Sequence, residues 1–238
     1  MARQGQNLTI QIMNELGQAI VTGAYGIDNP FPIEGELCRI HGVSRSVLRE
    51  ATKMLAAKGL LASRPRYGTW VQPDTAWNIL DPDVLGWLMA RKLEPALLIE
   101  FMQVRLVVEP MAARLAAMNG TADAIADIAA ALGRMQAAEI GADDVLASDI
   151  AFHVAVLQAS GNRFYARLRD LIAAALQTSI RVSNQMKGVR LASVADHKKV
   201  YDAIVARDAD RAAAAMYALI DEARELVTRW FEGPADRQ

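Results

Sequence analysis

The sequence contains a single cysteine, Cys38, among its 238 residues. One thiol cannot form an internal disulfide or a cysteine-based zinc cluster, and it suits a reducing compartment. The sequence also lacks any run of about 18 apolar residues, and polar side chains interrupt its first 22 residues, so we expect neither a membrane span nor a secretory signal. We therefore expect a cytoplasmic protein with no membrane partner.

The whole chain has no large excess of positive or negative charge, because its formal net charge is −1 at pH 7. The charge is nevertheless divided unevenly. Residues 1–71 hold eight basic and five acidic side chains, and the remainder holds 18 basic and 22 acidic ones. Seven basic residues lie from Arg39 to Arg66, where Glu50 is the only acid. This basic segment indicates a polyanion as partner, although a solvated basic helix has the same composition.

The N-terminal segment has the periodicity of helices joined by a tight turn. Apolar residues first recur every four positions, at Leu8, Ile12, Leu16 and Ile20. This spacing predicts a first helix that ends near Gly23. A short second helix from Glu34 should stop at Gly42, and Ser44 then stands at the N-cap position of a third.

After Gly59, the sequence LLASRPRYGTWV places a tip containing Pro and Gly between two short apolar runs, which predicts a β-hairpin. Helix, turn, helix and hairpin together form a winged helix-turn-helix domain, which we assign to residues 1–76. In such domains the start of the second helix of the motif reads base edges, and the hairpin can approach phosphates or the minor groove. The expected DNA-binding residues are Ser44, Arg45, Ser46 and Arg49 in the helix, and Arg64, Arg66 and Gly68 in the hairpin.

This segment also resembles a known family. The sequences GVSRSVLREATKMLAAKGLL and RYGTWV are similar to the DNA-binding signature of GntR-type bacterial transcription regulators. The resemblance implies a double-stranded DNA operator as the partner. One position departs from the family pattern, because Gly35 stands where an arginine is often found in the second helix.

From about Trp77 onward, the sequence predicts only helices. Apolar residues recur at helical spacing in Ala-rich segments that end in Gly or Asn, and no alternating strand pattern is present. Helices with wide apolar faces pack on one another, so residues 77–238 are predicted to form an all-α bundle. Pro, Asp and Asn punctuate residues 72–95, which places the boundary near residue 76. The expected fold class is therefore mainly α.

Histidine is scarce, and two of the three histidines lie in the predicted bundle. Asp149 and His153 share one helix face with apolar neighbours, and His197 begins a second apolar stripe. Polar groups in such stripes need partners. A carboxylate and two imidazoles that converge suit Zn²⁺, Ni²⁺, Mn²⁺ or Fe²⁺. A core histidine hydrogen-bonded to an aspartate explains the same pattern without a metal.

The bundle also resembles the FCD effector domain of the FadR branch of GntR regulators. The similar segments are VRLVVEPMAARLAA, DIAFHVAVLQASGN and DHKKVYDAIVARDADRAAAAM. The resemblance implies that Asp149, His153 and His197 are metal ligands, while Leu219 stands at the position of a fourth ligand. Three protein ligands leave a coordination position for water or an effector oxygen.

A further segment, WNILDPDVLGWLM, resembles the galactonate-operon repressors of this branch, which implies a sugar acid or other small carboxylic acid as effector. Arg105 and Glu109 occupy the family's Arg-x-x-x-Glu site, four residues apart on one helix face. They can form an ordinary intrahelical ion pair, or Arg105 can bind the carboxylate of an acid effector. The expected effector-binding residues are Arg105, Asp149, His153 and His197.

Two functions are compatible with these residues. The first is a homodimeric transcription regulator, a repressor, whose effector shifts the population between two arrangements of its DNA-binding heads. The second is a non-haem iron enzyme, because Asp149, His153 and His197 form a two-histidine, one-carboxylate set. The basic N-terminal domain favours the regulator, since an oxygenase has no use for it.

Overall fold

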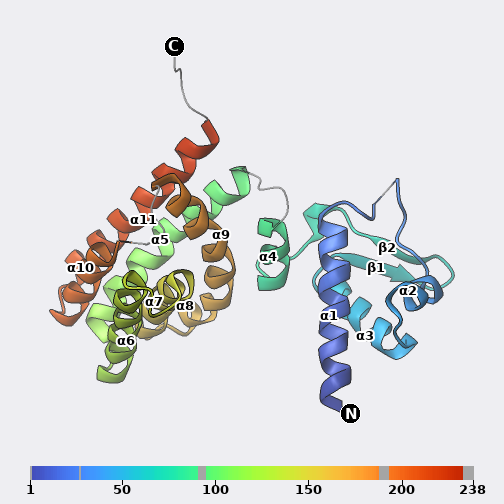
Figure 1. Ribbon diagram of the computed structural model, residues 1–238, viewed down its shortest axis with the longest axis horizontal. Helices are drawn as coiled ribbons and strands as arrows, with labels where there is room; N and C mark the ends of the chain where they lie inside the picture. Colours follow the sequence, from blue (N-terminus) through green and yellow to red (C-terminus); the bar gives the residue numbers. More distant parts are fainter. Residues whose placement is uncertain (1, 27, 91–94, 188–192, 233–238) are drawn as a thin grey trace. The chain divides into compact units, whose positions relative to one another are not determined.

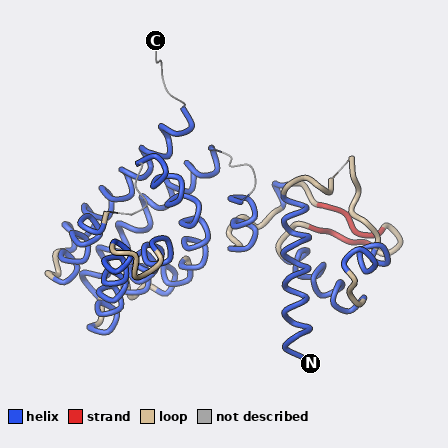
Figure 2. The backbone as a smooth tube through the Cα atoms, viewed as in Figure 1, coloured by secondary structure: helices blue, strands red, loops and turns tan. Residues whose placement is uncertain are grey.

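The computed structural model describes residues 2–26, 28–90, 95–187 and 193–232, and it confirms the mainly α-helical fold (Figures 1 and 2). Within these residues the only sheet is one antiparallel pair of short strands. The chain divides into two compact units, Met1–Leu93 and Glu94–Gln238, which we call the head and the body.

The described part of the head contains four helices, one hairpin and one 3-10 turn. These are α1 (Ala2–Val21), α2 (Glu34–His41), α3 (Arg45–Ala57), β1 (Leu61–Arg64), β2 (Gly68–Val71), η1 (Asp74–Ala76) and α4 (Pro82–Ala90). Helix α2 ends at Gly42, whose φ of 64° is easily reached by glycine. Ser44 caps α3, because its side chain accepts a hydrogen bond from the Val47 N–H. The predicted helix-turn-helix and hairpin are therefore confirmed.

Helix α4 packs with the head, although it lies beyond the boundary expected near residue 76. Val84 and Trp87 are buried in the same apolar core as residues of α1 and α3. Gly17 of α1 makes this packing possible, because a Cβ on Gly17 would lie 2.4 Å from the Trp87 ring. The Pro and Asp residues in the segment 72–95, which led to the predicted boundary, mark a turn within the head rather than the end of this compact unit. Residues 91–94 at its far end lie outside the described residues.

An ion-pair cluster joins the end of α3 to the start of α4. The Lys58 ammonium lies 2.8 Å from Asp81 Oδ2 and 2.7 Å from Asp83 Oδ2. Partial burial disfavours the Lys58 charge, but hydrogen bonds from Lys58 to both carboxylates outweigh this and raise the Lys58 pKa. The start of α4 is thus held against the helix that carries the expected base-reading residues.

The described part of the body is a bundle of seven helices. These are α5 (Pro95–Asn119), α6 (Ala122–Glu139), α7 (Val145–Ala159), α8 (Arg163–Arg167), α9 (Arg169–Lys187), α10 (Val194–Val205) and α11 (Ala209–Glu232). Helix α5 packs against α7 and α11, and α10 packs against α6, α5 and α11 (Figure 1). Four of these helices are capped by side-chain oxygens that accept a hydrogen bond from a free N–H of the first turn, those of Thr121, Asp144, Asn162 and Ser193.

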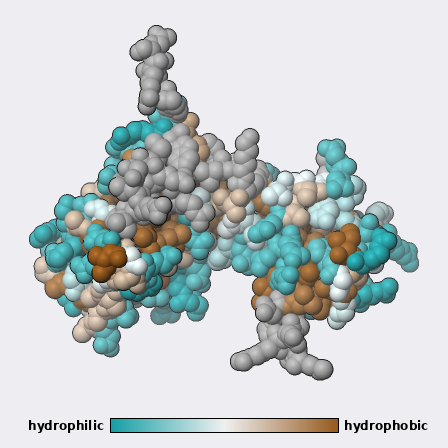
Figure 3. All heavy atoms as spheres, viewed as in Figure 1, coloured by the Kyte–Doolittle hydropathy of each residue, from teal (hydrophilic) through white to brown (hydrophobic). Residues whose placement is uncertain are grey.

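Most of the visible surface of both units is hydrophilic, with apolar patches between polar ones (Figure 3). Among the described helices, none is both long and apolar enough to cross a membrane. Helix α5 nevertheless exposes apolar side chains along one side: Val104, Val107, Met111 and Met118.

Candidate functional sites

The exposed face of α3 carries the residues expected to read DNA. All four are exposed: Ser44, Arg45, Ser46 and Arg49. The opposite face of α3 is buried in the head through Leu48, Ala51 and Leu55. This amphipathic pattern explains why α3 packs in one orientation and presents its polar side outward.

An acidic residue of α2 orients part of this face. Arg49 Nε donates to Glu34 Oε2 at 2.8 Å, whereas Arg45 Nε lies 3.7 Å from Glu34 Oε1. The hydrogen bond from Arg49 lowers the pKa of the Glu34 carboxyl. Arg49 is therefore hydrogen-bonded to α2 with its side chain still 63% exposed, and the Arg45 side chain is 75% exposed. Glu34 was not predicted as a partner of this face, although an acid in the first turn of α2 near a basic helix is a visible signal.

The tip of the hairpin presents the remaining basic residues. Arg64, Arg66 and Gly68 are exposed, and the Tyr67 N–H donates to the Arg64 carbonyl at 3.1 Å to close the turn. Arg66 has a φ of 69°, a conformation that costs a non-glycine residue roughly 1–2 kcal/mol. The Arg64 guanidinium lies 6.0 Å from the centre of the exposed Tyr67 ring. The turn therefore holds two arginines outward on a constrained backbone.

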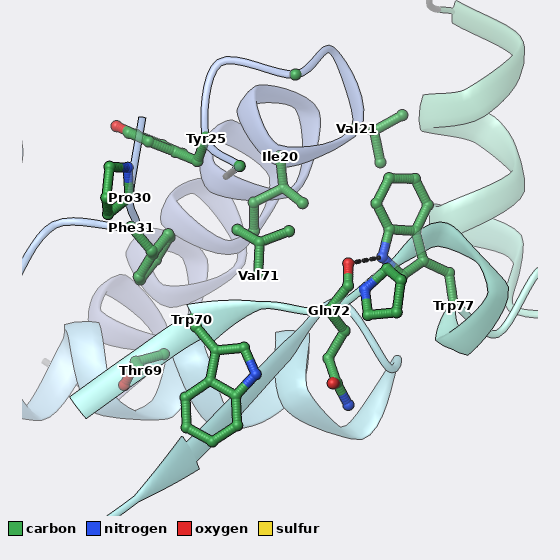
Figure 4. Close-up of a pocket in the computed structure, with 13 residues that line it drawn as sticks. Ile20, Val21, Tyr25, Pro30, Phe31, Thr69, Trp70, Val71, Gln72 and Trp77 are labelled. Atoms are coloured by element: carbon green, nitrogen blue, oxygen red, sulfur yellow. Dashed lines mark hydrogen bonds between the residues drawn. The ribbon is translucent and has the colours of Figure 1, made fainter. Parts of the chain in front are cut away.

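The head also contains a cavity of about 570 Å³ between the end of α1 and β2 (Figure 4). Four aromatic side chains line it: Tyr25, Phe31, Trp70 and Trp77. The Trp77 indole N–H is already used, since it donates to the Gln72 carbonyl at 3.0 Å. None of the lining residues is charged, so this cavity offers no cation to pair with a carboxylate.

The body brings together the three residues predicted to hold a metal. Asp149 and His153 lie on α7 and His197 on α10, and all three are at most 3% exposed. Asp149 Oδ1 lies 3.3 Å from His153 Nε2 and 3.2 Å from His197 Nε2. One ligand atom from each residue lies within 4.8 Å of the others.

Hydrogen bonds at the Nδ1 atoms fix how both imidazoles face this cluster. His197 Nδ1 lies 2.8 Å from the Ser193 carbonyl oxygen, and His153 Nδ1 lies 2.5 Å from Glu109 Oε2. Because both partners are acceptors, each Nδ1 carries a proton, and the Nε2 atom of each ring faces Asp149. Among the described residues, no group is aligned to hydrogen-bond with Asp149 Oδ1 or His197 Nε2. These converging donors fit a divalent cation.

Charge and burial oppose each other in this cluster. Burial disfavours the His153 cation, but the carboxylates of Glu109 and Asp149 outweigh it and raise the His153 pKa to about 9. Burial also disfavours the Asp149 carboxylate, yet both histidines hold its pKa well below the usual range. In the metal-free protein, His153 is therefore a cation between two carboxylates at neutral pH. A metal ion would take the place of its Nε2 proton.

Arg105 forms the intrahelical ion pair that its spacing allows, but the pair is buried. Its Nε donates to Glu109 Oε1 at 2.5 Å, and the two side chains are 3% and 1% exposed. Burial disfavours the Glu109 carboxylate, yet Arg105 and His153 lower its pKa to about 2. The contact from Glu109 to His153 was not predicted, because the two residues are far apart in sequence.

Leu219, which stands at the position of the fourth ligand, lies half-buried in α11.

Two family models match the chain: the FCD domain at residues 100–222, and the bacterial regulatory proteins of the gntR family at residues 8–71. The galactonate operon transcriptional repressor of Escherichia coli K12 is 35% identical over 90% of this chain and 94% of the relative. The HTH-type transcriptional regulator LutR of Bacillus subtilis is 28% identical over 80% of this chain and 87% of the relative.

Solved structures share the fold. Lar of Listeria monocytogenes aligns with a TM-score of 0.60 at 17% identity, covering 93% of this chain and 96% of the other. McbR/YncC of E. coli aligns with a TM-score of 0.54 at 17% identity, covering 94% and 98%. At these identities the likeness concerns the fold alone. The two curated relatives, by contrast, are named as transcription regulators rather than enzymes.

Proposed function

This chain belongs to the gntR family of bacterial regulatory proteins, with an FCD domain in its body, and we propose that it represses an operon for sugar-acid or carboxylic-acid catabolism. It is a DNA-binding transcription regulator, and the comparisons give no support to the non-haem iron enzyme. The similarity to a galactonate operon repressor supports a sugar acid as the effector. The protein acts in the cytoplasm, where its operator lies.

In this proposal α3 enters the major groove of the operator. Arg45 and Arg49 read bases, since a guanidinium can bind the O6 and N7 atoms of guanine together. Ser44 and Ser46 contact bases or phosphates at the start of the helix. The hairpin places Arg64, Arg66 and Gly68 against phosphates or in the minor groove. The exposure of every one of these residues supports the assignment.

The body binds the effector at the buried cluster, and this cluster is the observation that carries the proposal. Asp149, His153 and His197 would hold Zn²⁺, Ni²⁺, Mn²⁺ or Fe²⁺, which when bound supplies a Lewis-acid position for an effector oxygen. Arg105 pairs with the effector carboxylate. Its Nε is used by Glu109, but a guanidinium carries four further N–H donors. The charge-free cavity of the head does not offer these interactions.

The protein works as a homodimer in this proposal, and the exposed side of α5 is the surface that joins the copies. Val104, Val107, Met111 and Met118 lie three, four and seven residues apart, on one face of the helix. Its two end residues are symmetric about Met111, because Val104 and Met118 each lie seven residues from it. An antiparallel pair of α5 helices would place Val104 of each copy against Met118 of the other, as a two-fold interface requires.

The proposal is tested by operator release. Purified protein and its His153→Ala variant are analysed for bound metal and titrated with galactonate while bound to operator DNA. We expect the variant to bind the operator, because the reading residues lie in the head, but to lose both metal and the response to galactonate. A variant that contains as little metal as the wild type and responds normally would leave His153 as a hydrogen-bonded core residue.

A further inference from the structure

Glu109 lies between the residue expected to bind the effector and a residue expected to bind metal. We infer that Glu109 is a positioning residue that couples the two ligands, so that an acid effector and a metal ion strengthen each other's binding. This inference rests on the proposed function, because it takes the effector to be an acid that Arg105 binds. It adds a residue and a form of regulation to that site.

The two carboxylate oxygens of Glu109 have different partners. Oε1 accepts from Arg105 Nε and Oε2 accepts from His153 Nδ1, both at 2.5 Å. All three side chains are at most 3% exposed, so water does not compete for these hydrogen bonds. A change in what Arg105 binds therefore reaches His153 through a single group.

The contact with His153 determines which ring nitrogen faces the metal ligands. With Nδ1 donating to Glu109, the Nε2 lone pair of the neutral ring faces Asp149 and His197. A carboxylate behind a ligating imidazole also makes the imidazole a stronger donor, and removing such a partner typically weakens metal binding about 10- to 100-fold. Glu109 is thus expected to affect metal affinity without touching the metal.

The sign of the coupling follows from competition for Arg105. In the structure the Arg105 guanidinium donates to Glu109 and offsets part of its negative charge. An effector carboxylate that shares Arg105 leaves Glu109 less neutralised, so that Glu109 accepts more strongly from His153 and strengthens its Nε2 as a ligand. Linkage then requires the metal to tighten effector binding by the same factor.

The test measures zinc affinity with and without galactonate. Metal-stripped full-length protein is titrated with Zn²⁺ against a chromophoric chelator, and galactonate binding is measured with and without Zn²⁺. For the wild type we expect each ligand to tighten the other about 10-fold. Glu109→Gln should bind Zn²⁺ about 10- to 100-fold more weakly, and the mutual effect should shrink to the part that the direct contact between effector and metal supplies. Glu139→Gln, which removes the same charge from an exposed position, should behave like the wild type.

Glu109→Gln leaves two buried cations without their shared carboxylate, so its folding is checked by the thermal midpoint of the metal-free protein. If it does not fold, Glu109→Asp replaces it. The shorter carboxylate keeps the charge but cannot reach both partners, and we expect it to reduce the mutual effect as well. Either folded variant overturns the inference if it retains wild-type zinc affinity and the wild-type effect of galactonate.

A failure of the proposed function can be distinguished from a failure of the inference about Glu109. Wild-type protein that neither binds galactonate nor releases the operator in its presence would contradict the sugar-acid proposal. The zinc titrations without galactonate would still decide whether Glu109 positions His153. Wild-type protein that binds both ligands independently would overturn the coupling and the contact between effector and metal, but it would leave the sugar acid as the effector.

Discussion

At the residue scale, two arginines of the head are expected to contribute to DNA binding in different ways. Arg45 lies at the start of α3 with its side chain 75% exposed, whereas Arg66 lies at the hairpin tip. Arg45→Ala should cost about 1–3 kcal/mol on the operator and relax specificity at one base of each half-site. Arg66→Ala should instead weaken binding to all sequences and lower the salt slope by about one unit.

Binding titrations on operator and random duplexes over a range of salt concentrations distinguish these roles. Equal losses on both duplexes for Arg45→Ala would show that it contacts the backbone only. Lys53→Ala is a useful control, because Lys53 is exposed on α3 but pairs with Glu50 within the same helix.

The buried histidine predicts a pH dependence of stability in metal-free protein. The His153 pKa is raised from 6.5 to about 9 in the folded state, so the protonated ring stabilises the fold fully below about pH 6.5. This stabilisation is lost as the pH rises through about 9. Urea unfolding in the presence of a chelator should therefore show a fall in the free energy of unfolding over this range. His153→Gln should lack that fall, and an identical slope in both proteins would contradict the assignment.

At the element scale, the packing of α4 on α1 depends on one glycine. Gly17→Ala would place a Cβ 2.4 Å from the Trp87 ring, and overpacking of this kind costs about 1–3 kcal/mol. Gly35→Ala is the matched control. Gly35 is also helical but has no atom within 4 Å of an added Cβ, so it should stabilise the protein by about 0.5–1 kcal/mol. Denaturant unfolding of both variants checks the prediction, and a stabilising Gly17→Ala would show that α4 is free to move away.

The head shows which elements local sequence could predict. Ser44, Gly42 and the Pro65 turn act on their own neighbours, so the cap, the helix end and the hairpin could be located from spacing and residue type. The contact between Gly17 and Trp87 joins residues far apart in sequence, and no periodicity reports it. The expected boundary near residue 76 accordingly stopped short of a helix that packs with the head.

The same distinction applies to the cluster in the body. Asp149 and His153 could be paired from their spacing of four residues on one helix. His197 was added from the apolar stripe that it begins and from the resemblance to a family, because its distance from Asp149 depends on how α10 packs. Glu109 was noted as the partner of Arg105, but its second contact, with His153, depends on the packing of α5 against α7.

At the scale of the whole molecule, the symmetry of the protein and of its operator should correspond. A two-fold dimer presents two α3 helices to two half-sites, so the operator should be an imperfect palindrome. Both heads on one duplex also raise the effective concentration of the second contact. A change that separates the two copies should therefore weaken operator binding without altering any reading residue.

The exposed side of α5 is where such a change belongs. Val107 is 74% exposed and lies one turn from Met111, the centre of the proposed interface. Val107→Lys would place a charge in the apolar interface from each copy while leaving the fold of each copy intact. We expect sedimentation to show a shift from dimer to monomer and operator affinity to fall at least about 10-fold. Ile140→Lys, at an 83% exposed position at the end of α6, should leave both unchanged. A Val107→Lys protein that remains dimeric would place the interface on another surface, and a footprint without dyad symmetry would contradict the dimer itself.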